Sequence, residues 1–188
     1  MGTAAPRREG RRLSTLGPDR PFPADAFTDV LAGNAAFAAG FGDADLEAGA
    51  ARHLAVVTCI DSRIDALAVI GVHAGDAMVV RNAGARVTDD VLRTLVLATT
   101  VLGVDRILVM PHTRCKMASV EESALHAAIL RQHGIDTRSL EFRTVADQAA
   151  ALRDDVTRVR SSPFLRPEVV VGGAVYDVTT GRLLPVDA

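Results

Sequence analysis

Three short runs rich in aliphatic residues divide the middle of the chain and limit the folds open to it. They cover residues 54–58, 77–80 and 107–110. Short continuous apolar runs of this kind are typical of strands that are buried on both faces of a parallel sheet. A sheet with one solvated face would instead show alternating apolar and polar residues. The runs therefore predict three buried parallel strands.

Helical patterns lie between and after these runs. We expect helices at four places, namely a short one after Arg63, residues 88–102, residues 119–133 with Gly134 as the stop, and residues 145–160. Alternating strands and helices predict right-handed crossovers and the α/β class, with a mostly parallel central sheet flanked by helices. Near the end of the chain, residues 169–177 and 183–186 flank a turn at 180–181, which predicts a C-terminal hairpin.

The first part of the chain has two sections of different character. Residues 1–23 hold five arginines among glycine, proline, serine and threonine, which predicts a flexible arm. Residues 24–41 carry Phe27, Phe37 and other apolar residues at steps of three and four, as one face of an amphipathic helix does. This apolar stripe covers either the chain's own sheet or the surface of a partner. The whole chain is 48% hydrophobic, which is enough for a sizeable core, and residues 24–188 are expected to form a single domain.

Charge and hydropathy exclude several classes of partner. The formal net charge is -2, so the chain has no strong positive field to attract nucleic acid or an anionic membrane. No apolar run approaches the roughly 20 residues needed to cross a bilayer, and no apolar segment of a secretory signal follows Met1. We therefore expect a cytoplasmic protein that binds neither nucleic acid nor membranes. The arginine-rich arm also resembles a transit peptide faintly, which is the less favoured interpretation.

Both cysteines of the chain and one histidine follow predicted strands. Cys59 comes directly after the first run, and His112 and Cys115 come after the third. The carboxyl ends of parallel strands meet at one edge of the sheet, where such sheets bind ligands. Without an export signal, a metal or catalytic use of the cysteines is favoured over a disulfide. Two thiolates and an imidazole suit one tetrahedral Zn²⁺ per chain and leave a position for water, whose pKa the metal lowers toward about 7.

A carboxylate and a guanidinium stand beside the first predicted ligand, in the run 59–63. Asp61 either orients the bound water or takes the fourth metal position itself and closes the site. A two-pronged ion pair with Arg63 would keep the carboxylate off the metal. The plainer interpretations are a loop salt bridge for this pair, and buried thiols with a hydrogen-bonded histidine for the three ligand candidates. Residues 81–84 either line the same edge through backbone N–H groups or form only a tight turn.

Several separated motifs occur in order between residue 24 and the C-terminus. They are Cys59-x-Asp61-x-Arg63, Gly75-Asp76 leading into Val80-Arg81-Asn82-Ala83-Gly84, Leu102-Gly103-Val104, His112-Thr113-x-Cys115, and Gly173-Ala174-Val175-Tyr176-Asp177. Together they resemble the β-class carbonic anhydrases, and the short chain resembles the compact microbial branch of that family. The resemblance implies an enzyme, a carbonate dehydratase (zinc lyase), that hydrates CO2 reversibly to bicarbonate and a proton with zinc-bound hydroxide. In this chain Cys59, His112 and Cys115 would bind the zinc. Asp61 and Arg63 would form the orienting pair.

The resemblance also implies a homodimer or a higher assembly, with the N-terminal helix packed on the partner near the active site. Three positions depart from the family pattern: Pro111 and Lys116 stand where glycine is usual, and Arg114 replaces an acidic residue. Lys116 is the only lysine of the chain. Three interpretations of it are open: its charge acts on the bound water or bicarbonate, its side chain obstructs the pocket, or its side chain points to solvent. Two alternative functions therefore stay open: hydrolysis of a related small molecule such as carbon disulfide, and a zinc-bearing binding or sensor protein with weak catalysis.

Overall fold

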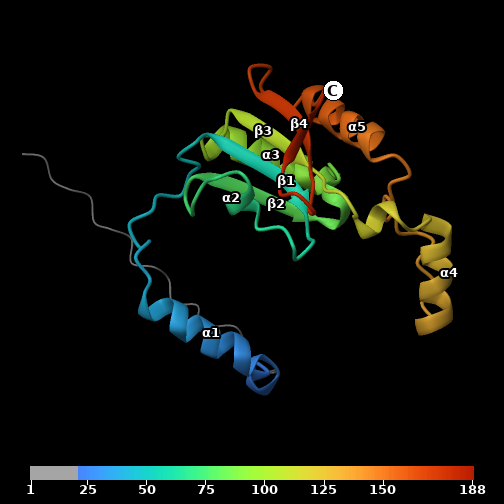
Figure 1. Cartoon of the computed structure of the whole chain (residues 1–188), viewed down its shortest axis with the longest axis horizontal. Helices are drawn as coiled ribbons and strands as arrows, with labels where there is room; N and C mark the ends of the chain where they lie inside the picture. The colour runs from blue at the N-terminus through green and yellow to red at the C-terminus, as the bar shows by residue number, and fades with distance from the viewer. Residues whose placement is uncertain (1–20) are drawn as a thin grey trace, which may run out of the picture. The chain divides into compact units, whose positions relative to one another are not determined.

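The computed structural model describes residues 21–188 (Figure 1). The strands are β1 Leu54–Cys59, β2 Ala77–Asn82, β3 Arg106–Met110, β4 Val170–Tyr176 and β5 Leu183–Val186. The α-helices are α1 Thr28–Ala39, α2 Ala66–Val69, α3 Asp89–Val101, α4 Glu122–His133 and α5 Gln148–Arg160. Short 3-10 turns are η1 Ala24–Phe27, η2 Ala83–Ala85 and η3 Lys116–Ala118. The contacts divide the chain into Met1–Ala44 and Asp45–Ala188, and the two parts are described separately below.

The second part is built on a sheet of five strands in the order β2-β1-β3-β4-β5. The first four strands are parallel, and β5 pairs antiparallel with β4. The predicted α/β class, the mostly parallel sheet and the C-terminal hairpin are therefore confirmed. One detail differs, because β2 lies at the edge of the sheet and exposes Val79 and Arg81, so it is not buried on both faces as the sequence predicted.

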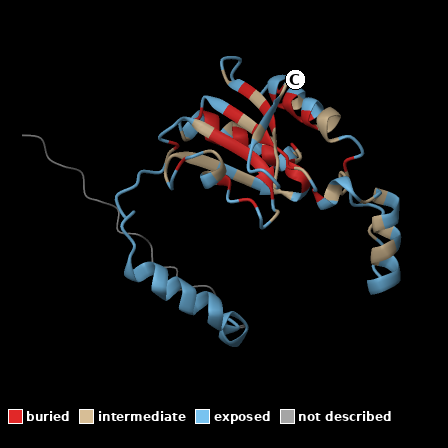
Figure 2. Ribbon diagram, viewed as in Figure 1, coloured by how far each residue is buried: buried red, intermediate tan, exposed pale blue. Residues whose placement is uncertain are grey.

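Figure 2 shows that the central strands are largely buried. Their alternate residues enter two hydrophobic cores, one on each face of the sheet. Val57 and Val109 face the larger core, which also contains Leu95 of α3 and Leu152 of α5. Val56 and Met110 face the smaller core on the other side. This division follows from the strand geometry, in which successive side chains point to opposite faces. Helices α3 and α5 thus cover one face of the sheet.

Local sequence signals account for the helix ends. The Thr88 side chain accepts a hydrogen bond from the Val91 N–H at the start of α3. Asp147 caps α5 in the same way by accepting from Ala149 and Ala150. Gly134 ends α4 in the left-handed conformation with φ 68°, as the sequence predicted.

The first part of the chain contains η1 and α1 within its described residues. None of the residues of α1 is buried. Its apolar side chains include Phe37, which is 64% exposed. The predicted organisation, an arm at 1–23 followed by one domain at 24–188, stays a prediction, since residues 1–20 lie outside the described part.

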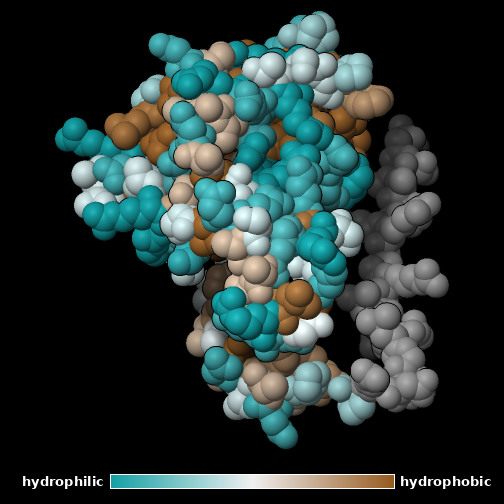
Figure 3. Space-filling model, turned by 90° about the vertical axis from the view of Figure 1, so that its right-hand side faces the viewer, coloured by the Kyte–Doolittle hydropathy of each residue, from teal (hydrophilic) through white to brown (hydrophobic). Residues whose placement is uncertain are grey.

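The surface of the described chain mixes residue types. On the face shown in Figure 3, hydrophobic and hydrophilic side chains are interspersed. Among residues 21–188, none of the helices has both the length and the apolar character needed to span a membrane.

Helix α5 lies close to β4 because Gly173 has no side chain. A Cβ atom placed at Gly173 would lie 3.0 Å from the Cγ atom of Leu152 and 3.1 Å from a Cγ atom of Val156. At the neighbouring Gly172, which points to the other face, a Cβ atom would meet nothing within 4 Å. Of the two glycines in β4, only Gly173 is required by the packing of α5 on the strand.

We predict that Gly173→Val lowers the free energy of unfolding by about 1–3 kcal/mol, because the larger side chain overpacks the α5–β4 contact. Gly172→Val is the matched control, and its free energy of unfolding should stay the same or rise slightly, since valine favours strands. Urea denaturation of both variants measures the difference. Equal losses in the two variants would contradict the packing argument.

Candidate functional site

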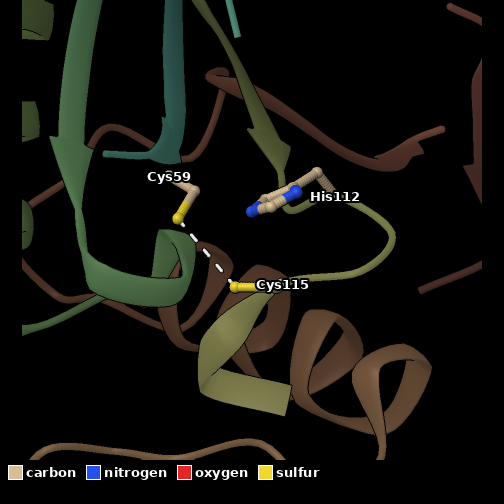
Figure 4. A group of neighbouring side chains, drawn as sticks. All are labelled: Cys59, His112 and Cys115. Atoms are coloured by element: carbon tan, nitrogen blue, oxygen red, sulfur yellow. Dashed lines mark hydrogen bonds between the residues drawn. The ribbon is translucent and has the colours of Figure 1, made fainter. Parts of the chain in front are cut away.

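Three side chains with metal-binding atoms meet at the carboxyl edge of the sheet (Figure 4). Cys59 is the last residue of β1, and His112 and Cys115 lie in the loop after β3. They come together because β1 and β3 are parallel neighbours, paired up to Thr58 and Met110. The two sulfur atoms and an imidazole nitrogen all lie within 4.8 Å of one another. All three side chains are buried.

The distance between the two sulfur atoms fits a shared metal ion. The Sγ atoms of Cys59 and Cys115 are 4.0 Å apart, and neither cysteine forms a disulfide. A disulfide bond is about 2.05 Å long. Two sulfurs bound at about 2.3 Å to a tetrahedral zinc ion lie about 3.8 Å apart. The observed separation is close to this second value.

The imidazole of His112 is oriented by the backbone of its own loop. Its Nδ1–H donates a hydrogen bond to the carbonyl oxygen of Thr113 at 2.9 Å. The other nitrogen, Nε2, is buried without a hydrogen-bond partner among the described residues. An unpaired buried polar atom costs about 1–3 kcal/mol, and a metal ion at the Nε2 lone pair removes this cost. The donor set of the three side chains therefore fits a zinc ion.

Burial shifts the pKa of Cys115 and of His112. It raises the pKa of the Cys115 thiol and lowers the pKa of the His112 imidazolium. Both shifts favour the neutral forms, because a charge is poorly solvated inside the protein. A divalent cation reverses this preference for the thiols, so metal binding at this cluster releases protons.

Residues outside the cluster fix the loop that carries His112. The Gln148 side-chain amide, at the start of α5, donates to the His112 carbonyl oxygen at 2.6 Å. The end of β4 holds the same loop, since the Tyr176 N–H donates to Pro111 and the Tyr176 carbonyl accepts from Thr113. Gln148 is not predicted from the sequence, because a single amide at a helix start has no distinguishing pattern.

Asp61 and Arg63 form a two-pronged ion pair beside the cluster. The Arg63 Nε–H donates to Oδ1 of Asp61 at 2.9 Å and an NH2 group donates to Oδ2 at 2.7 Å. These hydrogen bonds hold the pKa of the Asp61 carboxyl well below its usual range. The Oδ2 atom also lies 3.7 Å from Nε2 of His112. In the structure, the Asp61 carboxylate is therefore paired with Arg63.

The turn η2, which follows β2, contacts the first predicted ligand. The Gly84 N–H donates to the Cys59 sulfur at 3.3 Å. Gly84 has a φ of 82°, a conformation that favours glycine. Of the two interpretations of residues 81–84, the structure therefore supports a backbone contribution at the same edge.

An open hollow of about 480 Å³ leads to the cluster. Its walls include Asp61, Arg63 and Lys116 together with the two cysteines. Lys116 is exposed and forms no ion pair within the part of the chain that the structure describes. The hollow gives a small molecule access to the two cysteines of the cluster.

Comparison with known proteins agrees with this geometry. Residues 54–131 match the family model described as carbonic anhydrase. β-Carbonic anhydrase 1 of Mycobacterium tuberculosis is 36% identical over 156 residues, which cover 82% of this chain and 94% of the relative. A carbon disulfide hydrolase of Acidithiobacillus thiooxidans is 30% identical over 155 residues, covering 71% of this chain and 77% of the relative.

A solved structure extends the similarity to the fold. Carbonic anhydrase from Streptococcus mutans superimposes with a TM-score of 0.82 and 34% sequence identity, covering 86% of this chain and 97% of that one. The similarity includes both strands that carry the Cys-His-Cys cluster. The chain therefore belongs to the β-carbonic anhydrase family, a family of enzymes.

Proposed function

We propose that this chain is a zinc-dependent carbonate dehydratase that converts CO2 and water reversibly to bicarbonate and a proton. The observation that carries the proposal is the buried Cys-His-Cys cluster with Asp61 held beside it by Arg63. Three protein ligands with an open fourth position are typical of catalytic zinc, whereas structural zinc has four protein ligands. Membership of the family supports the same activity.

Each site residue has a defined task in this reaction. Cys59, His112 and Cys115 hold one zinc ion, which when bound supplies a water of lowered pKa. Asp61, ionised because Arg63 donates to both its oxygens, accepts a hydrogen bond from the attacking water and orients it toward the CO2 carbon. Arg63 also keeps this carboxylate away from the open metal position.

The hollow supplies the route for substrate and product. Ile60, Ala83 and Met117 add apolar wall to it, which suits uncharged CO2. Lys116 adds a positive charge on the same wall, which suits the departing bicarbonate anion. The proton released in each cycle leaves to solvent.

A second function uses the same site. Carbon disulfide is a linear molecule with an electrophilic central carbon like that of CO2, and carbon disulfide hydrolases are among the relatives of this chain. The third possibility, a zinc-bearing binding or sensor protein, differs from both in having little turnover. Release of hydrogen sulfide from carbon disulfide would favour the hydrolase. Bound zinc without measurable CO2 hydration or carbon disulfide hydrolysis would favour the binding protein.

The proposal includes a homodimer or a higher homo-oligomer in the cytoplasm. The oligomer is supported by the exposure of the apolar residues of α1, among them Val30 and Phe37. Exposed large apolar side chains that gather in a patch are typical of a contact with another protein. A second copy of the chain would cover them.

The first prediction from the proposed function concerns catalysis of CO2 hydration. The zinc-loaded protein should accelerate the reaction between about pH 6.5 and 9, and Asp61→Asn should lower kcat/KM by roughly 10²-fold because the attacking water loses its orienting acceptor. Stopped-flow measurement with a pH indicator gives the rates.

Asp136→Asn is the matched control for this variant. Asp136 and Arg138 have the same spacing, and Arg138 donates to Asp136 at 3.0 Å from Nε and 2.7 Å from NH2, with no predicted ligand nearby. The Asp136→Asn substitution should leave the CO2 hydration rate unchanged. If the purified zinc protein shows no hydration at any pH, the proposed activity is wrong.

The second prediction concerns the metal. The protein should contain one zinc per chain, and His112→Ala or Cys115→Ser should lose most of it because each removes one of three ligands. His133→Ala, at an exposed histidine, is the control and should keep it. Plasma mass spectrometry measures the ratio. Chelation should lower Tm, because the metal binds the folded state selectively. Full zinc content in His112→Ala would remove this residue from the ligand set.

The third prediction concerns Lys116. Lys116→Gly should raise the KM for bicarbonate in the dehydration direction by about two- to fivefold, because a charge at several ångströms in water contributes up to about 1 kcal/mol. The effect should shrink as salt is added. Steady-state dehydration kinetics at two ionic strengths give the answer. Kinetics equal to those of the unmodified protein would place the ammonium group in solvent, away from the site.

A further inference from the structure

Arg81 of β2 contacts the backbone of the loop that begins at Cys59. Its Nε–H donates to the Cys59 carbonyl oxygen at 2.8 Å, and an NH2 group donates to the Asp61 carbonyl oxygen at 2.7 Å. Both donors belong to one rigid, charged guanidinium group, and charged donors make stronger hydrogen bonds than neutral ones. A single side chain therefore ties a predicted metal ligand and the predicted orienting residue to the neighbouring strand.

The backbone around Arg81 completes this connection. The Ile60 N–H donates to the Asn82 carbonyl oxygen at 3.0 Å, and the Gly84 N–H donates to the Cys59 sulfur. The consecutive residues 59, 60 and 61 are thus each held from the end of β2. The loop has its position fixed by this strand before any side chain of the site is considered.

The ion pair of Asp61 and Arg63 does not by itself determine where the carboxylate lies. The two residues are two positions apart in one loop, so they can move together without breaking their hydrogen bonds. The Arg63 side chain is 48% exposed, and its one further hydrogen bond among the described residues is to the Arg114 carbonyl oxygen at 3.2 Å. The location of the pair must come from its backbone, which Arg81 holds.

A small displacement here would have a large effect. Oδ2 of Asp61 lies 3.7 Å from the His112 nitrogen that faces the ligand cluster. A shift of about 1 Å separates a carboxylate that orients a water from one that misses it or enters the cluster, and misplacement on this scale costs up to about 10²-fold in rate.

We propose that Arg81 is a positioning residue of the active site, which sets the place of the Asp61 carboxylate relative to Cys59, His112 and Cys115. The inference rests on the proposed function, because it concerns the efficiency of the same reaction. Arg81 acts through the loop backbone, because its side-chain hydrogen bonds within residues 21–188 are to carbonyl oxygens. Its effect should therefore fall on kcat, while metal binding stays intact.

The chain offers a matched control in Arg106, the first residue of β3. Its Nε–H and NH2 groups both donate to the carbonyl oxygen of Arg52, at 3.3 and 3.0 Å. Like Arg81, it is an exposed strand arginine that bonds to loop backbone, but it lies at the amino edge of the sheet. A merely structural role of such arginines would give the two substitutions the same consequences.

The experiment compares Arg81→Met, Arg81→Lys and Arg106→Met in the full-length zinc protein. We expect Arg81→Met to keep equimolar zinc and a KM within about twofold, while kcat falls by roughly 10- to 10²-fold. Arg81→Lys keeps a charged donor and should recover part of the lost kcat. If the methionine variant does not fold, the lysine variant replaces it in the comparison with Arg106→Met. Arg106→Met should keep the original kcat.

A spectroscopic measurement tests the inference without turnover. In the cobalt(II)-substituted protein, the visible bands report the coordination of the metal. In the diamagnetic zinc protein, the Arg63 Nε–H resonance reports the hydrogen bond to Asp61. Arg81→Met should change one or both, and Arg106→Met neither. Equal effects of the two methionine variants, or an unchanged kcat and unchanged spectra in Arg81→Met, would overturn the proposal. Failure of the unmodified protein to hydrate CO2 would instead remove the proposed function, and the spectra would still decide the role of Arg81.

Discussion

The parallel pairing of β1 with β3 is the constraint on which the rest of the site depends. The strands stay in register up to Thr58 and Met110, and the buried Thr58 hydroxyl donates to the Met110 carbonyl oxygen at 2.8 Å, so their ends are joined. The first ligand candidate follows Thr58 directly, and the loop of the other two follows Met110. Residues far apart in the sequence therefore meet within 4.8 Å. A slip of one residue would turn Cys59 to the opposite face and disperse the cluster.

Burial of the cluster makes metal binding and folding depend on each other. The smaller core contains both cysteines beside Val56, Ile64 and Met110, so the sulfur atoms are shielded from water. Neutral thiols tolerate this environment, and two thiolates tolerate it only with a cation between them. Asp61 lies beside this buried region and is kept ionised by its hydrogen bonds from Arg63. The Arg63 side chain is partly exposed, so this ion pair contacts solvent whereas the buried ligands do not. The site therefore joins a dry set of ligands to a charged pair at the surface.

The sequence contained enough to predict the sheet and the meeting of the site residues, because aliphatic runs and strand ends leave a pattern. It could not predict where the side chains are anchored. Arg81 and Gln148 bond to backbone carbonyl oxygens, which every residue has, so no partner residue marks the contact. The motif Asp-x-Arg is likewise insufficient alone, since Asp136 and Arg138 form the same pair, in which hydrogen bonds from Arg138 lower the pKa of Asp136 to about 2. Position beside His112, which only the fold provides, distinguishes Asp61.

Anchoring through the backbone also explains how the site accommodates the residues that depart from the family pattern. Pro111 has no N–H group, but its role is to accept from the Tyr176 N–H through its carbonyl oxygen, at 2.8 Å. Arg114 contributes its carbonyl oxygen to Arg63, so reversal of the side-chain charge leaves that hydrogen bond in place. Its positive φ of 55° turns the loop between His112 and Cys115, and the surrounding hydrogen bonds offset the strain of that conformation. Lys116 differs from these two because its side chain, and not its backbone, lines the hollow with Asp61 and Arg63. Among the departures, it is therefore the one whose side chain can change the chemistry of the site.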